Sequence, residues 1–189
     1  MFAGYALWLI PSPEEYKAWE KLMEFRPLHS SVKPDSKSYP CFAPHITLAT
    51  FANLPPTLDI DKLPIYDLRP PVMKFESWKR GDTYLGALII KLSKPRELER
   101  LHGVITDYLN DLSAEWKSRN FPHMSLFYVD EPQERLKLEE GLKDYKQMGT
   151  FGDSGDLDLH SRFTGTEVWL VDCTCSVRQW KVMEKRSLS

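Results

Sequence analysis

The sequence predicts a mixed fold of helices and strands, of the α/β or α+β class, built from two similar lobes. Short apolar runs typical of strands alternate along the chain with segments of helical periodicity. The order of strand, proline-started helix, polar loop and strand occurs twice, which indicates two lobes facing each other across a cleft and not a stacked array. A length of 189 residues suits one domain, so we expect residues 1–189 to form a single bilobal domain.

The first half of the chain is predicted to contain two strands and a helix. The continuous apolar run Tyr5–Ile10 indicates a central strand buried on both faces. A helix is predicted after Pro13, because two glutamates follow this proline and favour a helix start. Polar residues 29–40 indicate a loop, and a second strand is predicted at His45–Phe51. The helix carries apolar residues at helical spacing: Tyr16, Trp19 and Met23.

The middle of the chain is predicted to hold a hairpin and a second helix. Residues 53–71 contain five prolines and are predicted to be irregular. Strands at Val72–Arg80 and Tyr84–Leu92 are predicted to pair around a turn at Gly81. A helix opens at Pro95. Its apolar stripe consists of Leu98, Leu101, Ile105, Tyr108 and Leu112.

The last third of the chain continues the alternation. A strand is predicted to start at His123, and a third helix to cover about Pro132–Gln147. Residues 150–158 are predicted to be a loop. Two final strands are predicted near Thr166–Cys173 and Val177–Glu184.

Composition limits the partners and the compartment. The formal net charge is −2, which argues against broad electrostatic binding to nucleic acid, so we expect no stable nucleic-acid complex. A small anionic substrate needs only a few local donors. No apolar run is long enough to span a membrane, and the N-terminus lacks the basic flank of a signal peptide. We therefore expect a soluble, intracellular protein, and we expect a monomer.

Two matching motifs carry the chemistry. Pro-His-Ile-Thr-Leu occupies residues 44–48 and Pro-His-Met-Ser-Leu occupies residues 122–126. Alternate side chains of a strand point to the same face, so each histidine shares a face with the hydroxyl two residues later. The apolar residues between them face the core. The four polar residues predicted to face the cleft are His45, Thr47, His123 and Ser125.

Imidazole and hydroxyl side chains together suit chemistry at a phosphate. An ordinary histidine pKa of about 6.5 lets an imidazole take or give a proton near neutrality. Hydroxyls donate hydrogen bonds to phosphoryl oxygens. In-line displacement needs a base on one side of the phosphorus, an acid on the other and fixed donors between them. Two such strands supply these groups without a metal or another cofactor, and we expect neither.

A single histidine on a strand is more often structural than catalytic. Two matched motifs in the same strand–helix–loop context favour function. The other histidines occur without such a context: His29 and His160 fall in polar loops and His102 on a helix. The three cysteines cannot form a disulfide framework, and we interpret them as free thiols.

The paired motifs resemble those of the two-histidine (2H) phosphoesterase superfamily, and within it the fungal and plant cyclic phosphodiesterases. The similarity includes the opening Tyr-Ala-Leu-Trp-Leu-Ile-Pro, both histidine motifs and the ending Cys-Thr-Cys-Ser-Val-Arg-Gln-Trp. It implies an α+β fold with pseudo-twofold symmetry, an antiparallel sheet in each lobe and helices outside. It also implies hydrolysis of nucleoside 2′,3′-cyclic phosphates to 2′-phosphates, and of ADP-ribose 1″,2″-cyclic phosphate, a product of tRNA splicing, to the 1″-phosphate. Fungal relatives imply a Golgi association as an alternative to the cytoplasm.

The resemblance also implies roles for single residues. His45 and His123 would be the proton donor and acceptor, in an order that the sequence leaves open. Thr47 and Ser125 would bind the phosphate. The second motif carries serine where the first carries threonine, and the hydroxyl is kept. Tyr128 matches a substrate-contacting tyrosine. Trp8 matches an aromatic residue near the base or sugar, and a core tryptophan is the alternative interpretation.

Three other hypotheses remain open from the sequence. A 2′-5′ RNA ligase-like protein or an RNA 3′-end phosphodiesterase would use the same motif pair, although the acidic balance favours a small substrate. A non-catalytic nucleotide-binding module is disfavoured by the intact motifs. A histidine metal site lacks cysteine or carboxylate ligands at suitable spacing.

Overall fold

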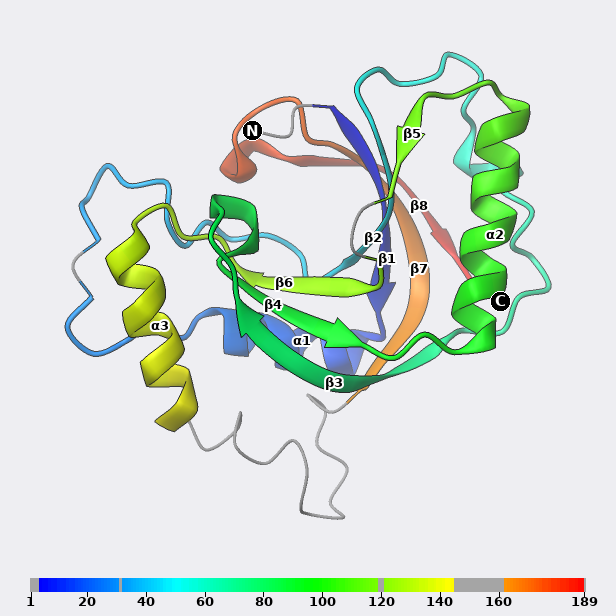
Figure 1. The fold of residues 1–189 in the computed structure, drawn as a ribbon. Coiled ribbons are helices and arrows are strands. Elements are labelled where there is room, and N and C mark those ends of the chain that lie inside the picture. Colours follow the sequence, from blue (N-terminus) through cyan, green and yellow to red (C-terminus); the bar gives the residue numbers. More distant parts are fainter. Residues whose placement is uncertain (1–3, 31, 119–120, 145–161, 189) are drawn as a thin grey trace.

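The computed structural model describes residues 4–30, 32–118, 121–144 and 162–188, and it contains both helices and strands (Figure 1). The helices are α1 (Pro13–Met23), α2 (Arg96–Asp111) and α3 (Pro132–Asp144). The strands are β1 (Tyr5–Pro11), β2 (Ile46–Phe51), β3 (Val72–Arg80), β4 (Leu88–Leu92), β5 (Trp116–Lys117), β6 (His123–Phe127), β7 (Arg162–Asp172) and β8 (Lys181–Ser187). This is the predicted α+β class.

Antiparallel pairing joins the strands of both halves into one continuous set. The order is β1-β2-β6-β4-β3-β7-β8, and β1 also pairs with β7, so six of these strands form a closed circuit. The two motif strands, β2 and β6, are neighbours and meet at the pair Ile46–Met124. The histidine motifs, which lie far apart in the sequence, are therefore adjacent at the centre of the sheet.

The repeated order found in the sequence has a structural counterpart. The unit β1-α1-β2 and the unit β4-α2-β6 each contain an antiparallel strand pair, and the two pairs meet at β2 and β6. Both pairs contain a register shift at the same motif position. Pairing skips Leu48 between β1 and β2 and skips Leu126 between β4 and β6, which makes each leucine the extra residue of a β-bulge. The two halves thus share local irregularity as well as strand order.

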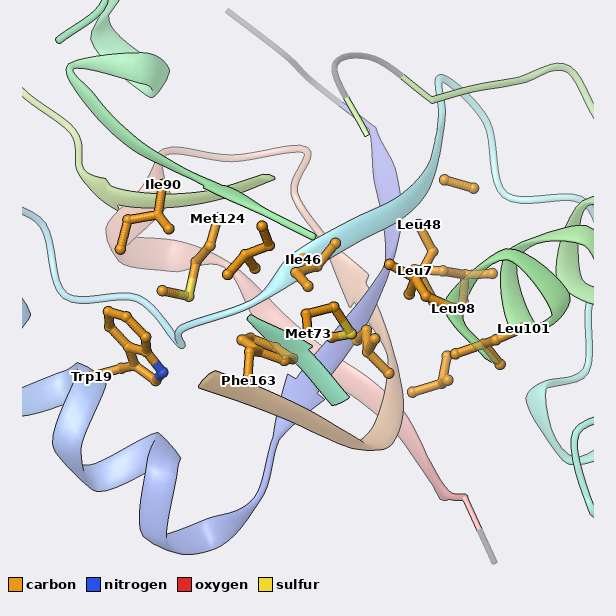
Figure 2. Packing of buried hydrophobic residues seen from close by; sticks show 14 of the residues in the cluster. Leu7, Trp19, Ile46, Leu48, Met73, Ile90, Leu98, Leu101, Met124 and Phe163 are labelled. Carbon is orange, nitrogen blue, oxygen red and sulfur yellow. The ribbon is translucent and has the colours of Figure 1, made fainter. Parts of the chain in front are cut away.

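The core lies on the face of the motif strands opposite the histidines. Ile46 and Met124 are fully buried and pack in one cluster with residues from β1, β3, β4 and β7 (Figure 2). Trp19 of α1 joins the cluster at one end, and Leu98 and Leu101 of α2 join it at the other. Truncating one such aliphatic side chain to alanine typically costs about 2–5 kcal/mol. This packing fixes which face of β2 and β6 the histidines occupy.

Helix α1 is attached to β7 by a buried carboxylate. Ser12 caps the helix, accepting a hydrogen bond from the Glu15 amide, and Pro13 occupies the first turn. The Glu15 side chain is only 1% exposed and accepts from the Arg162 guanidinium at 3.0 Å and from the Thr164 amide at 2.6 Å. An unpaired carboxylate at this depth would be strongly destabilising, so these bonds fix the helix start against the strand.

Several predicted boundaries need correction. The strand predicted at Tyr84–Leu92 begins only at Leu88, because Tyr84–Gly86 forms a 3₁₀ turn closed by a bond from the Gly86 amide to the Thr83 carbonyl. The last strand begins at Lys181 and not at Val177, because Val177–Gln179 also forms a 3₁₀ turn.

Two further differences concern lengths. The short strand β5 lies between the second helix and the second motif, where the repeated order of elements predicts a polar loop, and it pairs with the end of β2. Strand β7 begins at Arg162, earlier than predicted, because its first residues pair with β3. The predicted end of α3 at Gln147, the loop 150–158 and His160 lie outside the described residues. None of the helices among the residues described is long and apolar enough to cross a membrane.

Candidate active site

The strand register brings the four predicted motif residues onto one face. Because Ile46 pairs with Met124 in an antiparallel ladder, the neighbouring positions place His45 beside Ser125 and Thr47 beside His123. Each histidine of one motif therefore lies next to the hydroxyl of the other. The structure brings together all four residues that the sequence assigned to the cleft, on the face opposite the core.

His45 is held in a tightly defined environment. It is only 5% exposed, and its ring stacks on Trp8 with 3.7 Å between centroids and 12° between planes. Its Nδ1 lies 2.7 Å from the Ala43 carbonyl oxygen. A carbonyl oxygen only accepts, so Nδ1 carries the proton, and the neutral ring has its lone pair on Nε2. The backbone bond and the stacked indole thus fix both the tautomer and the orientation of this imidazole.

The pKa of His45 is lowered to about 4, mainly by burial; the bond to Ala43 acts in the opposite direction, and the charge on His123 adds a smaller lowering. The charge of His123 acts on His45 because β2 and β6 are neighbouring strands and each carries one of the two imidazoles. Removing an imidazolium from water is unfavourable, which accounts for the main effect. At neutral pH His45 is therefore neutral in the free protein.

His123 and Thr47 are more accessible than His45. Both are half-buried, whereas Ser125 is 8% exposed. His123 is the first residue of β6, where Lys91 of β4 pairs with it on one side. The second motif thus presents its imidazole at a strand end, where solvent and a substrate can reach it.

Ser125 and Tyr128 form a connected polar pair at the floor of the site. The Ser125 hydroxyl donates to the Leu85 carbonyl at 3.0 Å. Burial raises the pKa of Tyr128, which is 4% exposed, and a hydrogen bond with the Ser125 hydroxyl acts in the opposite direction. Tyr128 is therefore a neutral phenol near neutral pH and keeps its hydroxyl proton.

An aromatic cluster surrounds His45, and sequence reasoning identified only part of it. Phe42 stacks on Tyr128 at 4.0 Å and contacts His45 edge-on at 6.1 Å. Trp180 lies 5.6 Å from Trp8 and 6.0 Å from Tyr128. Phe42 lies three residues before the first motif histidine, a position that periodicity does not single out. Trp180 ends the C-terminal segment that resembles the cyclic phosphodiesterases, and this resemblance was the only sequence feature that pointed to it.

The structure places Trp8 under His45. Its 3% exposure and the stacking contact make it a supporting side chain of the imidazole, and little of its surface remains for a substrate. Tyr128 is almost as buried. Contact of either residue with substrate stays a prediction.

His102 was assigned no catalytic role from the sequence, yet it contacts the last residue of the first motif and a residue beside the second. Its ring stacks on Phe121, two residues before His123, with 4.1 Å between centroids and 18° between planes. Its Nε2 lies 3.1 Å from the carbonyl oxygen of Leu48. Burial lowers the pKa of His102, with an opposing effect of the Leu48 bond and a smaller lowering by Lys94. The bulge at Leu48 interrupts regular pairing there, which explains why its carbonyl accepts from a side chain.

Polar clamps hold the loops around the site. The Arg135 guanidinium donates to three backbone carbonyls, those of Val129, Asp82 and Asp130, at 2.8, 2.6 and 2.8 Å. Ser38 donates to the Glu131 carboxylate and accepts from the Asp130 amide. The Ser38 bonds connect the loop before the first motif with the segment after the second, and the Arg135 bonds connect that segment with the turn at Asp82. Within the described ranges, no group of three histidine, cysteine or acidic side chains is arranged to hold a metal ion.

Paired histidine–hydroxyl strands at the centre of a duplicated antiparallel sheet define the two-histidine class of phosphoesterases, and the chain has the fold of that class. It belongs to the cyclic phosphodiesterase-like protein family, which it matches over residues 1–188. A Neurospora crassa 2′,3′-cyclic-nucleotide 3′-phosphodiesterase is 25% identical over 214 residues, covering 98% of this chain and 99% of the relative.

Solved structures with the same fold include two bacterial proteins. The protein TT0787 of Thermus thermophilus matches with a TM-score of 0.57 and 14% identity, covering 98% of this chain and 97% of that one. LigT of E. coli, solved in complex with 3′-AMP, matches with a TM-score of 0.50 and 14% identity, covering 99% and 98%. At these identities the likeness concerns the fold.

Proposed function

We propose that this protein hydrolyses cyclic phosphodiesters, opening nucleoside 2′,3′-cyclic phosphates to nucleoside 2′-phosphates and ADP-ribose 1″,2″-cyclic phosphate to the 1″-phosphate. The observation that carries the proposal is the convergence of His45 and His123 on neighbouring strands, where each lies beside a hydroxyl of the other motif. Membership of the family and the name of the Neurospora relative support the choice of reaction.

His45 is the better candidate for the base. A base must be neutral with a free lone pair, and the pKa of about 4 together with the bond from Nδ1 to Ala43 provides both on Nε2. His45 takes a proton from water as the water oxygen bonds to phosphorus. His123, protonated, gives a proton to the departing 3′ oxygen as the P–O3′ bond breaks. Exchange of protons with solvent restores both residues.

The two motif hydroxyls donate hydrogen bonds to the negatively charged phosphate oxygens. Thr47, half-buried on the same face, can donate to a non-bridging oxygen. The Ser125 hydroxyl donates to the Leu85 carbonyl, so it must turn from that carbonyl to donate to a phosphate oxygen. The buried setting strengthens such bonds, because few water molecules compete for them. Since histidines move the protons and hydroxyls contact the phosphate, the reaction as proposed needs no metal.

The test is turnover of defined substrates by the purified protein, with and without EDTA. Nucleoside 2′,3′-cyclic phosphates, ADP-ribose 1″,2″-cyclic phosphate and an oligoribonucleotide with a 2′,3′-cyclic end are compared at equal concentration, and product regiochemistry is read by phosphorus NMR. We expect ring opening of the small substrates to the 2′- and 1″-phosphates in EDTA. Loss of activity on chelation would refute the metal-free reaction. Turnover of the oligonucleotide alone would identify an RNA-end enzyme.

A further inference from the structure

A cavity of about 200 Å³ lies beside the candidate active site. Three segments far apart in sequence form it: the loop at residues 35–37, the 3₁₀ turn at residues 84–85 and the C-terminal segment 175–180. Bonds between these segments hold the walls together. The Tyr84 hydroxyl donates to the Lys37 carbonyl at 2.9 Å, and Arg178 donates to the Ser36 carbonyl at 3.3 Å. The cavity is thus a built feature of the fold.

The cavity and the catalytic face share a wall. Trp180 lines the cavity and contacts both Trp8 and Tyr128 of the site. Tyr84 also lines it and lies 5.8 Å from Tyr128, ring to ring. The carbonyl of Leu85, another lining residue, accepts the hydrogen bond of Ser125. A molecule whose cyclic phosphate sits between the histidines would therefore extend its remaining atoms into this cavity.

The lining suits a flat ring next to an anion. Trp180 and Tyr84 offer aromatic surface, on which a nucleobase stacks well. Among the described residues that line the cavity, Lys37 and Arg178 supply two positive charges and Asp35 supplies one negative charge. Both cationic side chains are accessible to solvent, and Arg178 uses one nitrogen on Ser36, so further N–H groups of its guanidinium can reach a ligand. Arginine in such a position pairs well with phosphate oxygens.

We propose that this cavity, defined by Lys37, Tyr84, Arg178 and Trp180, is the subsite that selects the substrate. It takes the nucleobase against Trp180 and a second phosphate, on the 5′ side of the nucleoside, at Arg178 and Lys37. The preferred substrate class is then a nucleoside cyclic phosphate that also carries a 5′-phosphate or diphosphate. The inference deepens the proposed function, on which its statement about substrates rests.

Binding can be measured without turnover, which separates this inference from the proposed function. The probes are AMP and adenosine, titrated against the intact protein by calorimetry. We expect AMP to bind about tenfold more tightly than adenosine, and Arg178→Gln to remove most of that difference. The matched control is Arg100→Gln, because Arg100 lines a different cavity that shares no residue with this one. Equal affinity for the two probes, or equal effects of the two substitutions, would overturn the assignment.

Kinetics then test selection during the reaction. The substrates are glycerol 1,2-cyclic phosphate, adenosine 2′,3′-cyclic phosphate and its 5′-phosphorylated form. We expect kcat/KM to rise along this series. Trp180→Leu should lower it for both nucleosides by about tenfold more than for the glycerol compound, and Trp180→Phe should restore much of the loss. Equal losses on all three would mean that Trp180 only supports Tyr128, which contradicts the subsite. No turnover of any of them would refute the proposed function, while the AMP titration still decides the subsite.

Discussion

The two histidines occupy matching positions in the two halves of the sheet, yet their surroundings differ. The strand beside the first motif places Trp8 opposite Thr47, and the strand beside the second places Ile89 opposite Ser125. These are corresponding positions, since each lies next to the register shift in its own half. Trp8 stacks on His45 and buries it, whereas His123 remains half-buried. The repeated backbone supplies two equivalent places for an imidazole, and the neighbouring side chain makes the two rings chemically different.

That difference is what an acid–base pair needs. Two identical imidazoles would titrate together, so the fraction with one neutral and one protonated ring would be limited. Burial beneath Trp8 lowers the pKa of His45 to about 4, and the positive charge of His123 acts in the same direction. The asymmetry therefore favours a single state in which His45 is the neutral partner.

The largest expected effect comes from removing either imidazole. His45→Ala and His123→Ala should each lower kcat on a cyclic nucleotide by about 10²–10⁴-fold, because a positioned acid or base contributes that much. His29→Asn is the matched control. His29 is exposed and has a φ of 62°, a backbone conformation that asparagine tolerates.

Steady-state kinetics and thermal unfolding of all three variants provide the measurement. The control should keep full activity, and the alanine variants should stay folded. The pairing would be refuted by a well-folded single variant that retains wild-type kcat. Loss of activity in the His29 variant as well would point to a general defect and not to the motif.

A smaller effect should distinguish the two rings by pH. The base must be unprotonated, so on the acidic side of the profile kcat/KM should hold until the pH drops through the pKa of His45, about 4, which is below the ordinary value of 6.5. Trp8→Ile places isoleucine beside the first motif, as Ile89 lies beside the second motif at the corresponding position. It should rehydrate the imidazole and move the acidic limb of the profile upward, toward 6.5.

Far-UV circular dichroism across the same pH range shows whether the protein stays folded in acid. Ile89→Val is the control, since it alters the equivalent position in the other half without uncovering His45. A wild-type acidic limb near the ordinary histidine pKa of about 6.5, or an unmoved limb in Trp8→Ile, would contradict the role given to Trp8 and His45.

Much of the fold followed from local sequence pattern. The apolar run of β1, the alternation in the motifs and the stripe of α2 predict elements that the structure confirms, because each pattern reflects one buried face. The pairing of β2 with β6 was not predicted. The repeated order of elements predicted two similar lobes facing each other across a cleft, and it did not indicate that the two motif strands would be hydrogen-bonded neighbours.

What escaped prediction depends on tertiary contacts. Tyr84–Gly86 looked like a strand because of its residue types, but a turn there places Tyr84 against Lys37, far away in the sequence. The roles of Phe42 and Trp180 follow from loops that only the folded chain brings together. His102 looked ordinary because its two partners are remote in sequence: Leu48 lies 54 residues before it, and Phe121 follows it in a different segment.

Substitutions of His102 test whether a residue outside the site holds the two motif strands in register. Their effect on kcat should be the smallest of the three. We expect His102 to be a positioning residue, because its ring bonds to the carbonyl of Leu48, the bulged last residue of the first motif, and stacks on Phe121 beside the second motif. His102→Phe keeps a stacking ring and loses the hydrogen bond, while His102→Gln keeps a donor and loses the stack. Each should lower kcat by about fivefold, which corresponds to the loss of one such interaction, with KM little changed.

Gly103→Ala, next to His102 on α2, is the control, since an added Cβ there meets no neighbouring atom within 4 Å. If both His102 variants retained wild-type kcat while only their melting temperatures fell, His102 would be a packing residue, and the register of the two motifs would be set by the sheet alone.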